Sequence, residues 1–168
     1  MSGWDPTTLP SQAGRTIVVT GAGRGVGYFT AEQLAVASAR VIITTRGDAT
    51  RALESLRRAA PGADVSAVTL DVASLDSIRA AAPQLAALGP IDVLINNAGK
   101  TSGSKQREVT VDGLEIMVGT NALGPFALTA LLWPALADDA RIINLGSLST
   151  RLAKADLTDL QGERRYSL

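Results

Sequence analysis

The fold of this 168-residue chain is decided by the segment Thr20-Gly21-Ala22-Gly23-Arg24-Gly25-Val26-Gly27. The segment follows Thr16–Thr20, an apolar run rich in β-branched residues that predicts a buried strand. It leads into Val26–Ala39, whose residues have helical spacing. In a glycine-rich turn between a strand and a helix, backbone N–H groups and the helix dipole can face a pyrophosphate. A tight turn without a ligand is the alternative interpretation of the same residues.

Strand-like and helix-like segments alternate along most of the chain. Further strands are predicted at Val41–Thr45, Val65–Leu70, Ile91–Ile95 and Arg141–Leu145. Helices are predicted at Ala49–Ala60, at Leu75–Leu88 and at Asp112–Leu136, the last one interrupted around Asn121–Pro125. This alternation is typical of a doubly wound parallel sheet, so we expect one α/β domain of Rossmann type over residues 1–168. The pattern stops after Ser149, and the C-terminal strands of such a sheet are expected to be missing.

The composition excludes several classes of function. Apolar residues make up 46% of the chain, and 16 basic side chains balance 16 acidic ones, which is typical of a globular protein and not of a nucleic-acid binder. The chain contains no Cys and no His, which excludes a thiolate nucleophile, a Ser-His-Asp triad, a disulfide and a structural zinc site. Acid–base chemistry would have to use Tyr, Lys, Asp or Glu.

The sequence carries no evident targeting signal. Met1–Arg15 contains no apolar run of the kind found in secretory signals. No stretch approaches the roughly 18 consecutive apolar residues that span a bilayer. We therefore expect a cytoplasmic protein without a membrane span.

Polar residues and glycines follow the predicted strands at the edge where open α/β sheets bind ligands. They are Asp71-Val72, Asn96-Asn97-Ala98-Gly99 and Ser147. Together with T-G-x-x-x-G-x-G, in which Gly21, Gly25 and Gly27 are the spaced glycines, they make the chain resemble the short-chain dehydrogenase/reductase family from Thr16 to about Ser149. Asp156–Tyr166 resembles the retinol-dehydrogenase-like and WW-domain-oxidoreductase-like branch.

The resemblance implies a nicotinamide dinucleotide as cofactor. Within the glycine turn, which also contains Gly23 and Gly27, the residues implied to line the pyrophosphate and the adjacent ribose are Gly21, Arg24, Gly25 and Val26. Asp71 would bond the adenine amino group, with Val72 against the ring. Asn97, Ala98 and Gly99 would form the floor under the adenosine ribose.

Two of these polar residues have other interpretations. Asp71 could serve only as an N-terminal residue of the next helix, and Asn96 could tie neighbouring strands together and contact no ligand.

Two arginines favour NADP over NAD. Enzymes that use NAD usually place a carboxylate at the end of the second strand, where it bonds the ribose hydroxyls. Here that strand ends in Thr44-Thr45-Arg46, and Arg24 lies in the glycine turn. Two guanidinium groups suit a 2′-phosphate. Asp48 keeps NAD open as the alternative, and both arginines could also be solvated surface residues.

The resemblance also assigns catalytic roles. Asn121 matches the family's helix asparagine, whose backbone carbonyl holds a water of the proton relay; its alternative interpretation is a kink before Pro125 with a solvated amide. Ser147 matches the family's serine that bonds the substrate oxygen. Neither Tyr28 nor Tyr166 is followed by Lys four residues later, so the family's Y-x-x-x-K pair is absent.

We therefore expect an NADP(H)-dependent oxidoreductase acting on a carbonyl or alcohol, which as this 168-residue chain is inactive. Truncation of a longer enzyme is the favoured explanation for the missing pair. The alternative is a noncatalytic nucleotide-binding module. The substrate cannot be predicted, and self-association through the open edge of the sheet is expected.

Overall fold

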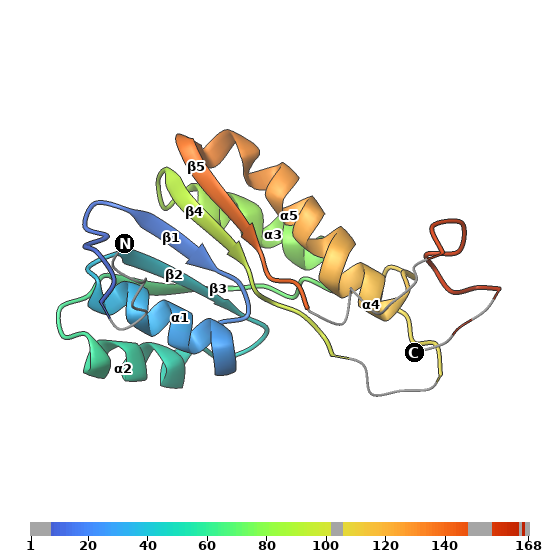
Figure 1. Cartoon of the computed structure of the whole chain (residues 1–168), viewed down its shortest axis with the longest axis horizontal. Helices are drawn as coiled ribbons and strands as arrows, with labels where there is room; N and C mark the ends of the chain where they lie inside the picture. Colours follow the sequence, from blue (N-terminus) through green and yellow to red (C-terminus); the bar gives the residue numbers. More distant parts are fainter. Residues whose placement is uncertain (1–7, 102–105, 148–155, 165, 167–168) are drawn as a thin grey trace, which may run out of the picture.

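A computed structural model of the chain describes residues 8–101, 106–147, 156–164 and 166. Its centre is a parallel sheet with the strand order β3-β2-β1-β4-β5 (Figure 1). The strands are β1 (Thr16–Val19), β2 (Arg40–Thr45), β3 (Val65–Thr69), β4 (Ile91–Asn96) and β5 (Leu136–Asn144). This strand order confirms the predicted doubly wound fold of Rossmann type.

Helices cover both faces of the sheet. On one face lie α1 (Gly25–Val36) and α2 (Thr50–Ala59), and on the other lie α3 (Leu75–Ala86) and α5 (Gly124–Leu132) (Figure 1). A short α4 (Ile116–Val118) and the π-turn η1 (Gly119–Leu123) lead into α5, and the 3-10 turn η2 (Trp133–Ala135) follows it.

Two apolar cores result from this layering. Alternate residues of a strand point to opposite faces, so Ile17 and Val19 pack on the side of α1 and α2 while Val18 packs on the side of α3 and α5. Helix residues such as Leu56 and Leu128 complete the two cores and are fully buried. Strands buried on both faces explain why the runs in the sequence are continuously apolar.

The last strand begins earlier than the predicted Arg141. Leu136 pairs beside Ile91, and the regular ladder resumes where Val93 pairs with Arg141. The residues between Leu136 and Arg141 bulge out of register, and Asp138 and Asp139 are exposed there. Because bulged positions do not follow the alternation of a strand, the sequence pattern revealed only the regular part.

The long helical run also begins later than the predicted Asp112. Gly113 has a φ of +78°, so a turn precedes the helix. Glu115 then starts α4 by accepting hydrogen bonds from two backbone N–H groups. The predicted interruption is confirmed as η1, where the N–H of Gly124 bonds the carbonyl of Gly119, five residues back.

One helical run among the described residues has the length and composition of a membrane span. It is Ile116–Ala135, with a mean hydropathy of 1.4, and 33% of its most apolar window is buried inside the protein. Core helices satisfy the same test, and Leu128 and Leu132 of this run are fully buried. The expected cytoplasmic location and absence of a span stay predictions.

Candidate functional site

The carboxyl ends of all five strands meet at one edge of the sheet, because every pair is parallel. From the central strand β1 the chain continues outward through β2 to β3, while β4 and β5 lie on the other side. This reversal creates the crevice in which open α/β sheets bind ligands. The glycine turn that follows β1 lies at this point.

A hydrogen-bonded junction joins the end of β1 to the end of β4. The hydroxyl of Thr20 accepts from the backbone N–H groups of Asn97 and Ala98, at 3.0 and 2.9 Å, and lies 3.3 Å from the carbonyl of Ile95, to which it donates. The side-chain Nδ2 of Asn97 donates to the carbonyl of Thr20 at 2.7 Å. The sequence analysis did not identify Thr20 as a site residue, although it is the first residue of the T-G-x-x-x-G-x-G motif.

Close packing requires glycine at two positions of the turn and leaves little room for a side chain at a third. A Cβ on Gly21 would lie 2.8 Å from the Cα of Ala98, and one on Gly27 would collide with the Nδ2 of Asn97. A Cβ on Gly23 would lie 3.1 Å from the Cγ2 of Thr45. These positions bring the turn, α1 and the Asn97-Ala98 segment into direct contact.

Gly25 is different, because no protein packing excludes a side chain there. No atom lies within 4 Å of the position of its Cβ, yet its φ is +61°, a conformation that favours glycine. Gly25 is the first residue of α1, and Arg24 and Val26 beside it are exposed. The first N–H groups of a helix have no partner within the helix. This part of the turn can therefore approach a phosphate closely.

Two charged residues after β2, Arg46 and Asp48, are candidates for contact with the ribose, and their surroundings differ. Arg46 is exposed, as is Arg24. The Oδ1 of Asp48 accepts from the backbone N–H of Thr50 at 3.0 Å and from its hydroxyl at 2.6 Å. The hydrogen bond from the hydroxyl, and to a lesser extent that from the backbone, lowers the pKa of Asp48 below its usual value. One oxygen of Asp48 is thus committed to the start of α2.

After β3, Asp71 shapes a turn and Val72 enters the core. The Oδ1 of Asp71 accepts from the N–H of Ala73 at 2.9 Å, and Asp71 lies before Ser74, which caps α3. The second carboxylate oxygen of Asp71 is not used in this turn. Val72 is only 6% exposed and packs with Ile78. The expectation that Val72 lies against an adenine ring stays a prediction.

Asn96 ties the sheet together, as one of its two interpretations proposed. Its Nδ2 donates to the Oδ1 of Asn144 at 2.8 Å and to the hydroxyl of Thr129 at 3.2 Å. Asn96 is 5% exposed and thereby links β4 to both β5 and α5. These contacts account for the Nδ2 of Asn96, whereas its Oδ1 is buried without a hydrogen-bond partner among the described residues.

Asn121 holds the segment that follows Gly99. Its Oδ1 accepts from the N–H of Lys100 at 2.8 Å, and its Nδ2 donates to the carbonyl of Lys100 at 2.9 Å. The amide is therefore engaged, which corrects the interpretation of it as merely solvated. A Cβ on Gly99 would lie 3.1 Å from the Oδ1 of Asn121. Pro125 has no N–H to donate to the Asn121 carbonyl, which is the group that the family resemblance assigns to the relay.

Ser147 and Tyr166 differ in their surroundings. Ser147 is exposed and follows the end of β5, where Asn144 pairs with Asn96. The hydroxyl of Tyr166 lies 3.4 Å from the Oε1 of Glu115, to which it donates. Burial and then the nearby Glu115 carboxylate raise the pKa of Tyr166. A raised pKa is the opposite of what an acid–base tyrosine requires.

The glycine turn, the junction of β1 with β4 and the polar strand ends define the ligand edge of a dinucleotide-binding α/β domain. The family model described as short chain dehydrogenase matches residues 15–158. The chain belongs to this family.

Curated relatives are similar over nearly the whole chain. Polyprenol dehydrogenase from Mus musculus is 40% identical, with 96% of this chain and 50% of that protein covered. Retinol dehydrogenase 12 from Mus musculus is 38% identical, with 95% and 52% covered. The chain spans about half the length of the curated relatives it matches. The retinol-dehydrogenase-like placement is confirmed by these relatives.

Solved structures share the architecture. The crystal structure of an uncharacterised protein from Mycobacterium Paratuberculosis matches with a TM-score of 0.83 and 40% identity, covering 99% of this chain and 58% of that one. The Pseudomonas aeruginosa RhlG/NADP active-site complex matches with a TM-score of 0.72 and 33% identity, covering 90% and 62%.

Proposed function

We propose that this protein is an NADP(H)-dependent short-chain oxidoreductase that moves hydride between the nicotinamide and a carbonyl or alcohol substrate. The observation that carries the proposal is the glycine turn at the β1–β4 crevice. There Gly21 packs tightly against Ala98, while Gly25 combines a left-handed backbone with open space. Tight packing fixes the turn, and the open space leaves its backbone accessible to a phosphate.

The residues present fit a dinucleotide along this edge. The backbone of the turn would hold the pyrophosphate, and the Asn97–Gly99 segment, fixed by Thr20, would lie under the adenosine ribose. The carboxylate oxygen of Asp71 that the Ala73 N–H does not bond would accept from the adenine amino group. When bound, the nicotinamide would supply or accept the hydride.

NADP is the proposed form of the cofactor. Arg24 and Arg46 are both exposed at the ends of the first two strands, where the 2′-phosphate of NADP would lie. Asp48, the competing ligand for a 2′-hydroxyl, already accepts two hydrogen bonds from Thr50. The RhlG structure, a relative of this chain, is an NADP complex.

Ser147 and Asn121 have proposed roles at the reacting end. The hydroxyl of Ser147 would donate to the substrate oxygen, and the backbone carbonyl of Asn121 would hold a relay water. Asn121, in η1, bonds Lys100 beyond the end of β4, and Ser147 follows the neighbouring strand β5. Two relatives are named for alcohols, polyprenol and retinol, which supports an alcohol or its carbonyl counterpart as the substrate class.

The second candidate is nucleotide binding without turnover by the 168-residue chain. The observation that favours it is the state of Tyr166, whose hydroxyl donates to Glu115 and whose pKa is raised by burial and by that carboxylate. Ser147 alone is a poor acid or base near neutral pH. On this proposal the chain binds the cofactor but does not reduce or oxidise a substrate.

A fluorescence titration of the chain with NADPH and with NADH tests the proposal. Saturable binding that is tighter for NADPH is the expected result. Saturable binding of neither nucleotide would contradict the proposed function in both its catalytic and noncatalytic forms.

A further inference from the structure

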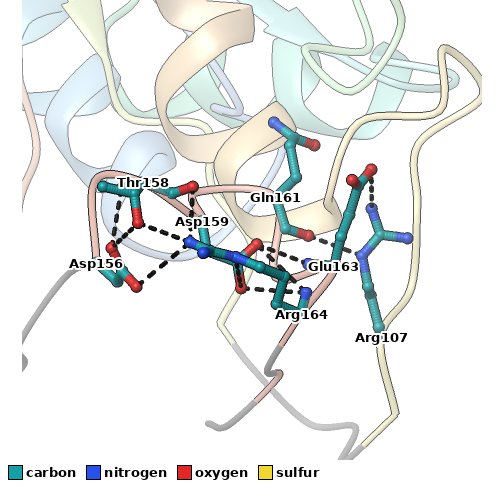
Figure 2. A network of polar contacts seen from close by, with 7 residues as sticks. All are labelled: Arg107, Asp156, Thr158, Asp159, Gln161, Glu163 and Arg164. Atoms are coloured by element: carbon teal, nitrogen blue, oxygen red, sulfur yellow. Dashed lines mark hydrogen bonds and ion pairs between the residues drawn. The ribbon is translucent and has the colours of Figure 1, made fainter.

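A compact loop packs against the residues that precede α4. We call Asp156–Arg164 the return loop (Figure 2). Inside it, the carboxylate of Asp159 accepts from the N–H of Glu163 at 3.0 Å and from that of Arg164 at 3.2 Å. Arg164 in turn donates to the carbonyl and the hydroxyl of Thr158, at 3.0 and 2.6 Å. The loop is thus held by its own side chains.

Gln161 anchors the return loop to the residues before α4. Its Oε1 accepts from the backbone N–H of Glu115 at 2.8 Å. Its backbone carbonyl accepts from the Nε of Arg107 at 2.7 Å, and Arg107 also lies 3.9 Å from the carboxylate of Glu163 (Figure 2). One residue of the loop therefore contacts both ends of the segment between Arg107 and Glu115.

Glu115 connects the return loop to the start of the helical run. Glu115 is only 4% exposed, and its Oε2 accepts from the N–H groups of Met117 and Val118 at 2.9 and 2.8 Å. The other oxygen, Oε1, accepts from Tyr166. A buried carboxylate requires such partners, because an unpaired one would be strongly destabilising.

The same helical run carries Asn121 six residues further on. Asn121 makes two hydrogen bonds to the backbone of Lys100, next to the Asn97–Gly99 segment. A continuous chain of contacts thus leads from Gln161 through Glu115 and α4 to Asn121 and Lys100.

We propose that Gln161 and Glu115 are positioning residues that hold Asn121 in register with the Asn97–Lys100 segment. The return loop is thereby fixed to the helical run that carries Asn121. The inference rests on the proposed function only in that Asn121 and Ser147 serve the reaction; the physical coupling is independent of it.

Residue-resolved hydrogen exchange of the full 168-residue chain, without nucleotide, tests the coupling. In Gln161→Met, which keeps the length of the side chain but removes its acceptor, protection of the Glu115 N–H should fall about fivefold or more. The Lys100 N–H donates to the Oδ1 of Asn121, and Gln161 makes no hydrogen bond to Lys100 or Asn121 among the described residues. Protection of the Lys100 N–H should nevertheless fall at least about twofold. Arg107→Met should produce the same pattern.

Gln84→Met is the matched control, because Gln84 is exposed on α3 and bonds only within its own helix. Gln84→Met should leave the protection of both amides unchanged. The amides of β1 should keep their protection in every variant. If Glu115 loses protection while Lys100 keeps it, the anchor is only local and the positioning proposal is wrong. Unchanged protection at both amides would also overturn it. The outcome is separate from nucleotide binding, since no step of the experiment uses NADPH.

Discussion

The hydroxyl of Thr20 accepts hydrogen bonds from the backbone N–H groups of Asn97 and Ala98, at the point where β1 and β4 end. Thr20 is 1% exposed, so these bonds are shielded from water. The carbonyl of Thr20 accepts from the side chain of Asn97 as well. One residue pair, Thr20 and Asn97, therefore fixes the glycine turn relative to the segment expected under the ribose.

Thr20→Val should destabilise the protein by about 1–3 kcal/mol, because it keeps the shape of the side chain but leaves buried donors without their acceptor. Nucleotide affinity should fall with it. Thr20→Ser, which keeps the hydroxyl, should lose less. Urea unfolding of the three proteins measures the difference, and equal stability of Thr20→Val and the parent chain would show that the junction contributes nothing.

Arg46→Asp should erase or reverse the preference for NADPH over NADH. A charge-assisted hydrogen bond to a phosphate is worth about 1.5–3 kcal/mol, which corresponds to a tenfold or larger change in affinity. Fluorescence titration with both nucleotides gives the ratio. Arg79→Asp on α3 is the control for the change in charge, since α3 covers the other face of the sheet, and it should leave the ratio unchanged. A parent chain that binds both nucleotides equally would contradict this assignment.

The 168-residue chain should show no appreciable NADPH-dependent reduction of aldehydes or ketones and no oxidation of alcohols. Burial first, and then carboxylates, raise the pKa of Tyr166, and burial also leads the causes that raise the pKa of Tyr28. In a spectrophotometric titration both tyrosines should therefore ionise above the ordinary value of about 10. Absorbance at the nicotinamide band follows turnover. Robust turnover that is lost in Tyr166→Phe would make Tyr166 the acid–base group, and turnover that persists in this variant would place that group elsewhere.

The outer edge of β5 should promote self-association. Among the described residues no strand pairs with that edge, and Ile143 is 45% exposed. A charged side chain on an edge strand opposes pairing with a second chain. Sedimentation velocity should show concentration-dependent association that Ile143→Lys weakens and Val111→Lys, at an exposed loop position, does not. A chain that is monomeric at every concentration tested would contradict the prediction.

The sheet and the glycine turn could be predicted because their signals are local. Each signal is contained in a short stretch of sequence, as in the β-branched run Val41–Thr45 and in the glycine spacing from Gly21 to Gly27. The same local signals failed at β5, where a bulge separates Leu136 from the regular ladder. They also did not reveal that Val72 faces the core, because the residue after a strand can point either way.

Contacts between distant segments could not be predicted from one sequence. Gln161 accepts from the N–H of Glu115 across 46 positions, and no spacing or composition marks this pair. Thr20 was within the motif, but its role depends on Asn97, which is 77 positions away. Such partners are set by the topology of the sheet, which brings the ends of β1 and β4 together.

The most direct test of the account compares two glycines of similar conformation. Gly25 and Gly62 both have positive φ, +61° and +83°, and neither has an atom within 4 Å of its Cβ position. Gly25→Ala and Gly62→Ala should therefore lose similar stability, roughly 1–2 kcal/mol. Titration with NADPH distinguishes them: we expect saturable binding by the parent chain and by Gly62→Ala, and at least about tenfold weaker binding by Gly25→Ala. Equal NADPH affinity of both variants, or no saturable binding by the parent chain, would contradict the claim that this turn holds the nucleotide.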